Sequence, residues 1–163
     1  MTVRALFTTS ALLLQLLLAA TSAADQSTCR GIWLFELPCT EPISALMNQV
    51  NDWSSDKCQD SQEKCMYEIT KESSTYLEIK HTSRRSHKIT LISFDLNPPA
   101  VPTFCKMRVV STTTSPNEVT PNDYCLIYNL INGSGLTKAR GYREICNKQM
   151  CPSKQSATCY NEE

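Results

Sequence analysis

The sequence is poor in the residues from which most enzyme sites are built. It has two histidines, His81 and His87, and four glycines among 163 residues. No Gly-x-Ser-x-Gly, His-Glu-x-x-His, phosphate-binding glycine loop or EF-hand spacing is present. Catalysis by histidine needs a nucleophile or carboxylate that orients the ring, and the sequence around these two offers no obvious one. We therefore expect a protein that is not an enzyme and that uses no cofactor.

An excess of charge of either sign is also missing. Sixteen basic and sixteen acidic residues leave no net charge, so bulk charge predicts no polyanion partner such as a nucleic acid and no membrane partner. Internal repeats and low-complexity tracts that would mark a linker are absent as well. The length suits a single domain with one modest core.

The long apolar run of this chain lies at its start. Residues 11–20 are apolar apart from Gln15, a basic residue precedes them at Arg4, and small residues occupy positions 21–24. This run is shorter than the roughly 20 residues that span a bilayer, and the whole pattern is typical of a secretory signal peptide. We predict that residues 1–24 are a signal peptide and that residues 25–163 form one disulfide-rich, secreted extracellular domain without a membrane segment.

Cysteine is abundant in this predicted mature chain. The nine cysteines are Cys29, Cys39, Cys58, Cys65, Cys105, Cys125, Cys146, Cys151 and Cys159. In an oxidising compartment their density indicates a disulfide framework, and they lack the paired Cys-x2-Cys spacing of common zinc sites, so we expect no metal. The odd number leaves one thiol free, buried or available for a disulfide-linked dimer. One bridge, between Cys105 and Cys125, is predicted because both lie on consecutive predicted strands.

The apolar pattern changes from helical to alternating along the chain. Residues 31–37 are expected to form a buried strand that ends at Pro38. A helix is expected over residues 40–53, because Thr40 can cap it and apolar residues recur at helical spacing from Ile43 onward. Period-two alternation or short apolar runs predict strands near residues 67–70, 77–80, 89–91, 104–110 and 124–131, followed by a C-terminal loop held by disulfides.

These elements predict an α+β domain in which one N-terminal helix packs on a four- or five-stranded antiparallel sheet. A helix followed by an antiparallel meander resembles the layout of cystatins, although their inhibitory Gln-x-Val-x-Gly signature is absent here. The triplet Gly31-Ile32-Trp33 resembles the Gly-x-Trp of the first lipocalin strand, although the predicted strands are too few for an eight-stranded barrel.

Two surface segments are candidate sites. The candidate anion-binding residues of the first segment are Lys80, His81, Arg84, Arg85, His87 and Lys88. Three interpretations remain open for it: a polar turn between strands, a cationic patch for an acidic glycan, phosphate or acidic protein, and a dibasic processing site. The second is the glycosylation sequon at Asn132, which falls in a predicted turn.

The C-terminal part resembles a group of known secreted proteins. The stretch from Tyr124-Cys125 through Gly141-Tyr142 to Cys159-Tyr160 resembles the end of small uncharacterised secreted proteins of marine animals, some of them similar to components of the coral skeletal organic matrix. This resemblance implies an extracellular role and offers no catalytic residue.

The function that these patterns favour is that of a non-catalytic secreted binding or structural protein, with an extracellular matrix component as one candidate. Its expected partner is an extracellular protein or an acidic glycan. One alternative is a secreted inhibitor or effector on a cystatin-like scaffold. Another is a small-molecule carrier of lipocalin type, which would need an apolar cavity enclosed by the sheet.

Overall fold

A six-stranded antiparallel sheet forms the frame of the protein in the computed structural model, which describes residues 26–54, 63–97, 102–114, 123–157 and 159. The strands are β1 (Gln26–Phe35), β2 (Tyr67–Glu72), β3 (Tyr76–Thr82), β4 (Ile89–Asn97), β5 (Cys105–Thr114) and β6 (Arg143–Ile145). Their order across the sheet is β2-β3-β4-β5-β1-β6. Strands β2 to β5 therefore form a meander, and β1 pairs with the last strand of that meander rather than with the first.

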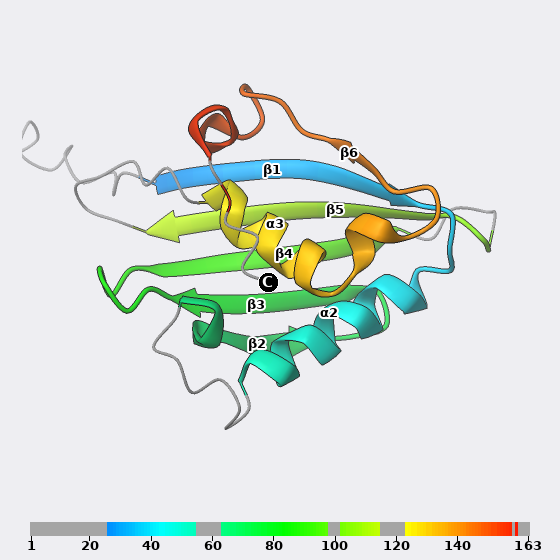
Figure 1. Ribbon diagram of the computed structural model, residues 1–163, viewed down its shortest axis with the longest axis horizontal. Helices are drawn as coiled ribbons and strands as arrows, with labels where there is room; N and C mark the ends of the chain where they lie inside the picture. Colours follow the sequence, from blue (N-terminus) through cyan, green and yellow to red (C-terminus); the bar gives the residue numbers. More distant parts are fainter. Residues whose placement is uncertain (1–25, 55–62, 98–101, 115–122, 158, 160–163) are drawn as a thin grey trace, which may run out of the picture.

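Two helices, α2 (Thr40–Trp53) and α3 (Asp123–Gly133), lie on the same face of the sheet (Figure 1). The α2 residues Ile43, Leu46 and Val50 are buried at helical spacing, so the stripe expected from the sequence is a core face. Strand residues alternate between this core and the opposite side; in β1, for example, Trp33 and Phe35 are fully buried. We call the opposite side, which α2 and α3 do not cover, the outer face.

Three short 3-10 helices complete the described chain: η1 (Glu63–Met66), η2 (Leu136–Lys138) and η3 (Pro152–Ser156). No helix in the described ranges has the length and apolar character needed to cross a membrane. The predicted signal peptide, residues 1–24, lies outside the described residues.

The α+β class is confirmed, but the prediction of one helix and four or five strands is imprecise. The helix at residues 40–53 and the strands near residues 67–70, 77–80, 89–91 and 104–110 are present. Residues 124–131, expected as a strand, instead lie in α3, where Leu126, Ile127, Leu130 and Ile131 are buried. The expected C-terminal loop contains β6 and η3 as well.

Disulfides join elements that are far apart in the sequence. The bridges with described partners are Cys29–Cys151, Cys39–Cys105 and Cys125–Cys159. Cys65 is disulfide-bonded too, whereas Cys58 lies outside the described residues. These bonds indicate an oxidising environment of the extracellular type.

The predicted bridge between Cys105 and Cys125 is wrong. Cys105 begins β5 and bonds to Cys39, which immediately precedes α2, with their Cα atoms 4.8 Å apart. Cys125 lies on α3 and bonds to Cys159. The prediction failed because it assumed that residues 124–131 form a strand beside β5.

Candidate functional site

The cationic segment predicted from the sequence is the hairpin between β3 and β4. Hydrogen bonds from Ser83 N to Lys88 O (2.9 Å) and from His87 N to Ser83 O (2.8 Å) close its turn. Arg84, Arg85 and His87 are exposed, and His87 adopts a left-handed conformation (φ 55°). We call Arg84, Arg85, His87 and Lys88 the hairpin tip.

The other two residues of this predicted site do not belong to the tip. His81 points from β3 into the core, is 2% exposed and lies against Tyr67, with 4.6 Å between the ring centroids. Lys80 points to the outer face and pairs with Glu68 at 2.5 Å. The candidate anion-binding group is therefore smaller than expected, and of the two histidines only His87 lies at the tip.

A second cationic surface, which the sequence analysis missed, lies on the outer face. The register pairs Ile32 of β1 with Arg108 of β5, and Leu34 with both Lys106 of β5 and Arg143 of β6. Arg30 precedes Ile32 by two positions and so points to the same side. The four exposed cations, which we call the outer basic face, are Arg30, Lys106, Arg108 and Arg143.

The charge of the outer basic face is only partly balanced. Among the described outward-pointing residues of β4, β5, β1 and β6, Asp95 is the one acid, and it lies opposite Arg108 in the register. No ion pair joins any of the four cations to another described residue. Aliphatic side chains lie between the cations, including Ile145, which is 45% exposed.

A polar cluster attaches the C-terminal segment, which contains β6 and η3 (residues 143–156), to the core side of the sheet. The carboxylate of Glu144, on β6, accepts hydrogen bonds from the Tyr124 hydroxyl (3.0 and 3.1 Å) and the Tyr142 hydroxyl (3.4 Å). Lys154, on η3, forms a salt bridge with the same carboxylate, whose side chain is 12% exposed. Burial and the Glu144 charge raise the pKa of Tyr142 to about 12 and raise that of Tyr124 as well. Because each group is satisfied by its neighbours, the cluster is best explained as a junction of β6, α3 and η3.

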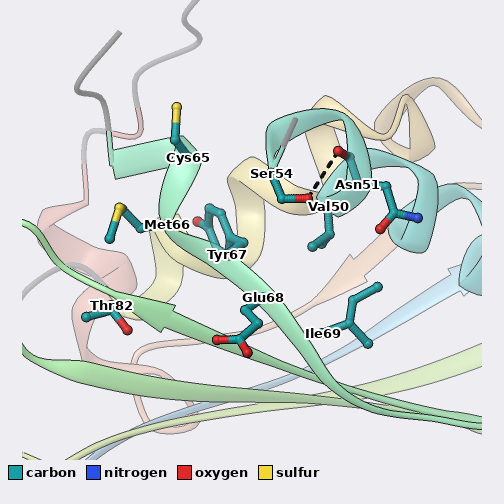
Figure 2. Close-up of a pocket in the computed structure, with 9 residues that line it drawn as sticks. All are labelled: Val50, Asn51, Ser54, Cys65, Met66, Tyr67, Glu68, Ile69 and Thr82. Atoms are coloured by element: carbon teal, nitrogen blue, oxygen red, sulfur yellow. Dashed lines mark hydrogen bonds between the residues drawn. The ribbon is translucent and has the colours of Figure 1, made fainter. Parts of the chain in front are cut away.

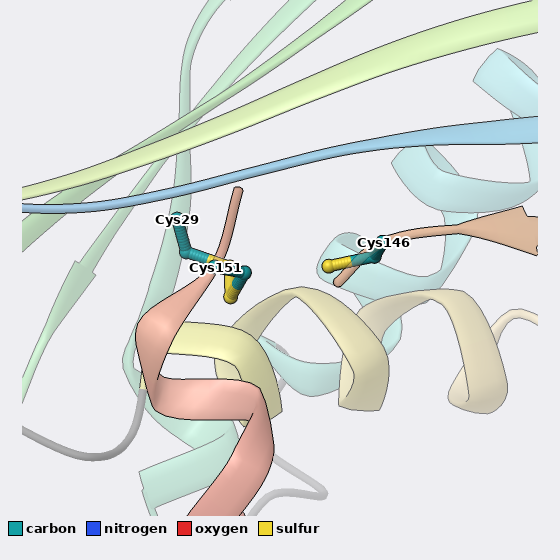
Figure 3. A group of neighbouring side chains, drawn as sticks. All are labelled: Cys29, Cys146 and Cys151. Atoms are coloured by element: carbon teal, nitrogen blue, oxygen red, sulfur yellow. A yellow bond between two sulfur atoms is a disulfide. The ribbon is translucent and has the colours of Figure 1, made fainter. Parts of the chain in front are cut away.

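Three cysteine sulfurs meet beside this junction. Cys146 carries a free thiol and lies next to the Cys29–Cys151 disulfide, with all three Sγ atoms within 4.8 Å of one another (Figure 3). A soft metal would need three thiolates, and two of these sulfurs are bonded to each other. In the disulfide form, the group therefore offers one thiol and one disulfide rather than a metal site.

A hollow lies between the end of α2 and β2 (Figure 2). It has a volume of about 420 Å³ and is lined by Val50, Tyr67, Ile69 and other residues. Among its described lining residues, Glu68 is the one with a charge, and it is already paired with Lys80. These described residues therefore present no group poised for chemistry in the hollow.

Asn132 lies in the last turn of α3 rather than in the predicted turn after a strand. Its Oδ1 accepts a hydrogen bond from the Thr137 hydroxyl at 2.8 Å, and its side chain is half-buried. Glycosylation of Asn132 remains a prediction.

Comparisons with known proteins leave the family open. No protein-family model matches the chain, and no curated protein matches it. Among solved structures, the crystal structure of Ara h 8.0201 aligns with a TM-score of 0.37 and 9% sequence identity, over 69% of this chain and 98% of that one. This degree of similarity assigns no function.

The described residues thus present two cationic surfaces, one on a projecting turn and one across the strands of the sheet. The hairpin tip projects from one end of the β3–β4 pair, whereas the outer basic face spreads across three neighbouring strands. Cations on neighbouring strands of a sheet are held at a spacing set by the strand register, while those of a turn depend on one loop. The arrangement on the sheet is therefore the better preorganised of the two for a repeating anionic ligand.

Proposed function

We propose that this chain is a secreted, non-catalytic binding protein of an extracellular matrix, and that its outer basic face holds an acidic glycan. The observation that carries the proposal is the set of four exposed Lys and Arg side chains on β1, β5 and β6, without ion pairs to other described residues. The disulfides support an extracellular location.

The spacing of these cations suits a polyanion. Neighbouring strands are about 4.8 Å apart and alternate residues of one strand about 7 Å apart, so each cation lies about 7 to 10 Å from the next in the register, a spacing on the order of the Debye length of about 8 Å at physiological salt. Their potentials therefore add. Three of the four are arginines, whose planar guanidinium groups donate paired hydrogen bonds to sulfate or carboxylate oxygens.

The aliphatic residues of the outer face also suit a glycan. Leu34 lies between Lys106 and Arg143 in the register, and Ile32 lies between Arg108 and Ile145. A sugar chain could place its charged groups on the cations and the C–H faces of its rings on these side chains, which removes apolar surface from water.

The rival functions require other parts of the structure. An inhibitor or effector would use a projecting loop, and the hairpin tip is such a loop among the described residues. A carrier would need an open interior between helices and sheet, and large side chains such as Trp33, Phe35 and Phe94 are fully buried there. The outer basic face serves neither role.

Two variants with the same change of charge separate the two cationic surfaces. Retention on a heparin column should fall for Arg30→Gln/Arg108→Gln, which would elute at clearly lower salt than wild type. Arg84→Gln/Arg85→Gln should elute close to wild type, because it changes only the hairpin tip. Greater loss of retention in the tip variant would move the site to the tip, and unchanged elution of both would refute anion binding at either surface.

A further inference from the structure

The three cysteines beside β1 are arranged as a nucleophile and its target. Cys29 lies on β1, Cys146 directly follows β6, and Cys151 directly precedes η3. In Figure 3 the Cys146 side chain points toward the Cys29–Cys151 bond. Thiol–disulfide exchange requires a thiolate that reaches one sulfur of a disulfide, and with all three sulfurs within 4.8 Å a small side-chain movement brings them into contact.

The surrounding chain holds Cys146 in this position. Gly31 has no side chain, and a Cβ atom placed there would lie 3.4 Å from Cys146 Cβ, so the cysteine occupies the space above the strand next to Cys29. The thiol donates to Arg30 O at 3.4 Å, and Cys146 O accepts a hydrogen bond from Lys154 Nζ at 3.1 Å. The turn to Cys151 is closed by a bond from Cys151 N to Asn147 O at 2.9 Å.

We propose that Cys146 and the Cys29–Cys151 disulfide form a thiol–disulfide exchange site that changes how the C-terminal segment is attached to β1. The Cys146 thiolate attacks one sulfur of the disulfide, a new S–S bond forms, and the electron pair of the old bond leaves on the other sulfur. The leaving thiolate takes up the proton that Cys146 lost. No oxidant or reductant is consumed, because the number of thiols and disulfides is the same before and after.

The two directions of attack have different structural results. Attack on Cys29 gives a Cys29–Cys146 bond, so β1 stays linked to the C-terminal segment but at a different residue. Attack on Cys151 gives a Cys146–Cys151 bond within one short turn and frees Cys29. In that form β1 has no direct covalent link to the segment, which is then held by the Glu144 cluster and the Cys125–Cys159 bond.

The exchange rate should depend on pH. Burial raises the pKa of the Cys146 thiol; Lys154, on η3, opposes this shift and Glu144, on β6, adds to it. Tyr124 faces the site from α3, and β1 contributes the backbone carbonyl of Arg30. Since the thiolate is the nucleophile, the rate should rise about tenfold per pH unit below the thiol pKa.

The direct test is disulfide mapping of the native wild-type chain after incubation near neutral pH and about two units higher. Acid quenching, alkylation and digestion in acid should reveal a fraction in which Cys146 is bonded and Cys29 or Cys151 is alkylated, formed faster at the higher pH. If Cys146 is the only one of the three that is alkylated at both pH values, the proposal is wrong. A dimer linked through Cys146 on a non-reducing gel would also overturn it, because that thiol would be consumed.

A pair of variants tests the same geometry by disulfide mapping. After refolding in a glutathione redox buffer and acid quenching, Cys29 and Cys146 of Cys151→Ala should be joined to each other. In the matched control, Cys159→Ala, the Cys29–Cys151 bond should remain the main form. Folded Cys151→Ala, verified against the control by circular dichroism, in which Cys29 and Cys146 are found as thiols or glutathione adducts would contradict the proposed reach of Cys146.

Discussion

Replacing Cys29 and Cys151 together by alanine should lower the free energy of unfolding by about 4 kcal/mol. Their bond spans 122 residues, and closing a loop of that length alone would contribute about 5 kcal/mol through the entropy of the unfolded chain. The actual loop is shorter. A second path runs from Cys29 to Cys39, crosses to Cys105, continues to Cys125, crosses to Cys159 and ends at Cys151. It contains only about 40 residues, and closing a loop of that length corresponds to about 4 kcal/mol.

This shared path makes the prediction sharper. The three disulfides span 122, 66 and 34 residues, so independent loops would differ by about 1 kcal/mol between the first and the last. In the native connectivity all three belong to one cycle. Removing any one of them while the other two remain should therefore cost a similar amount, within a few tenths of a kcal/mol.

Urea unfolding of the three double-alanine variants, at a mildly acidic pH that suppresses thiolate formation, measures these differences. Each midpoint and slope gives the free energy of unfolding in water. A spread of about 1 kcal/mol that follows the sequence separations would refute the shared-cycle reasoning. A loss far above 4 kcal/mol for Cys29 and Cys151 alone would show that packing around these fully buried sulfurs dominates over chain entropy.

Three further predictions concern the C-terminal segment. Glu144→Gln should lower the free energy of unfolding in urea by about 2 kcal/mol, since it removes the charge that three donors share. The control Glu36→Gln breaks an exposed ion pair and should cost less than about 1 kcal/mol. Equal losses would refute the importance of burial. Because the pKa of Tyr142 is raised to about 12, the stability that its protonated hydroxyl contributes should be complete below about pH 10 and be lost as the pH rises toward 12. Urea unfolding of wild type and Tyr142→Phe between pH 9 and 12 measures this loss, and a difference between the two that does not change with pH would contradict it. Gly141→Ala should lower the melting temperature far more than Gly135→Ala. Both positions have positive φ, but only at Gly141 would a Cβ lie 2.8 Å from the backbone nitrogen of Glu36. Equal melting temperatures of the two variants would contradict this.

Local pattern was sufficient for the elements that have one polar and one apolar side. In β3 the residues Leu77, Ile79 and His81 point inward, and the period of two predicts this for all three. The assignment of His81 to the hairpin tip failed because the turn was taken to begin before the strand had ended. The alternation of side chains along the strand already indicated that His81 points inward with Leu77 and Ile79.

Local pattern failed for α3 because that helix is buried on most sides. Seven of its eleven residues are buried, so its sequence is a nearly continuous apolar run, which a strand buried on both faces would also show. A helix signal was nevertheless available, since Asp123 lies in the first turn and a carboxylate there favours the positive end of a helix.

The pairing of β1 with β5 and β6 could not be predicted from any local signal. It brings Arg30, Arg108 and Arg143 to one surface, and brings Cys29, Cys146 and Cys151 together on the other side. Such contacts join residues up to 122 positions apart, and the cysteine spacing alone is compatible with many connectivities. Only the order of strands in the sheet determines which of these residues meet.

The alternation of side chains along β1 also places the two proposed sites on opposite faces of the sheet, so that they are independent of each other. Its inward residues, Cys29 and Gly31, build the exchange site, while its outward residues, Arg30 and Ile32, belong to or border the outer basic face. A sheet separates the two groups, so Arg30→Gln should weaken heparin retention without altering which cysteines are paired, because only its backbone contacts Cys146. Conversely, Cys146→Ser should fix the Cys29–Cys151 pairing and leave retention unchanged. If either substitution changed both properties, β1 would be transmitting a rearrangement from one face to the other, and the two sites would have to be treated as one coupled system.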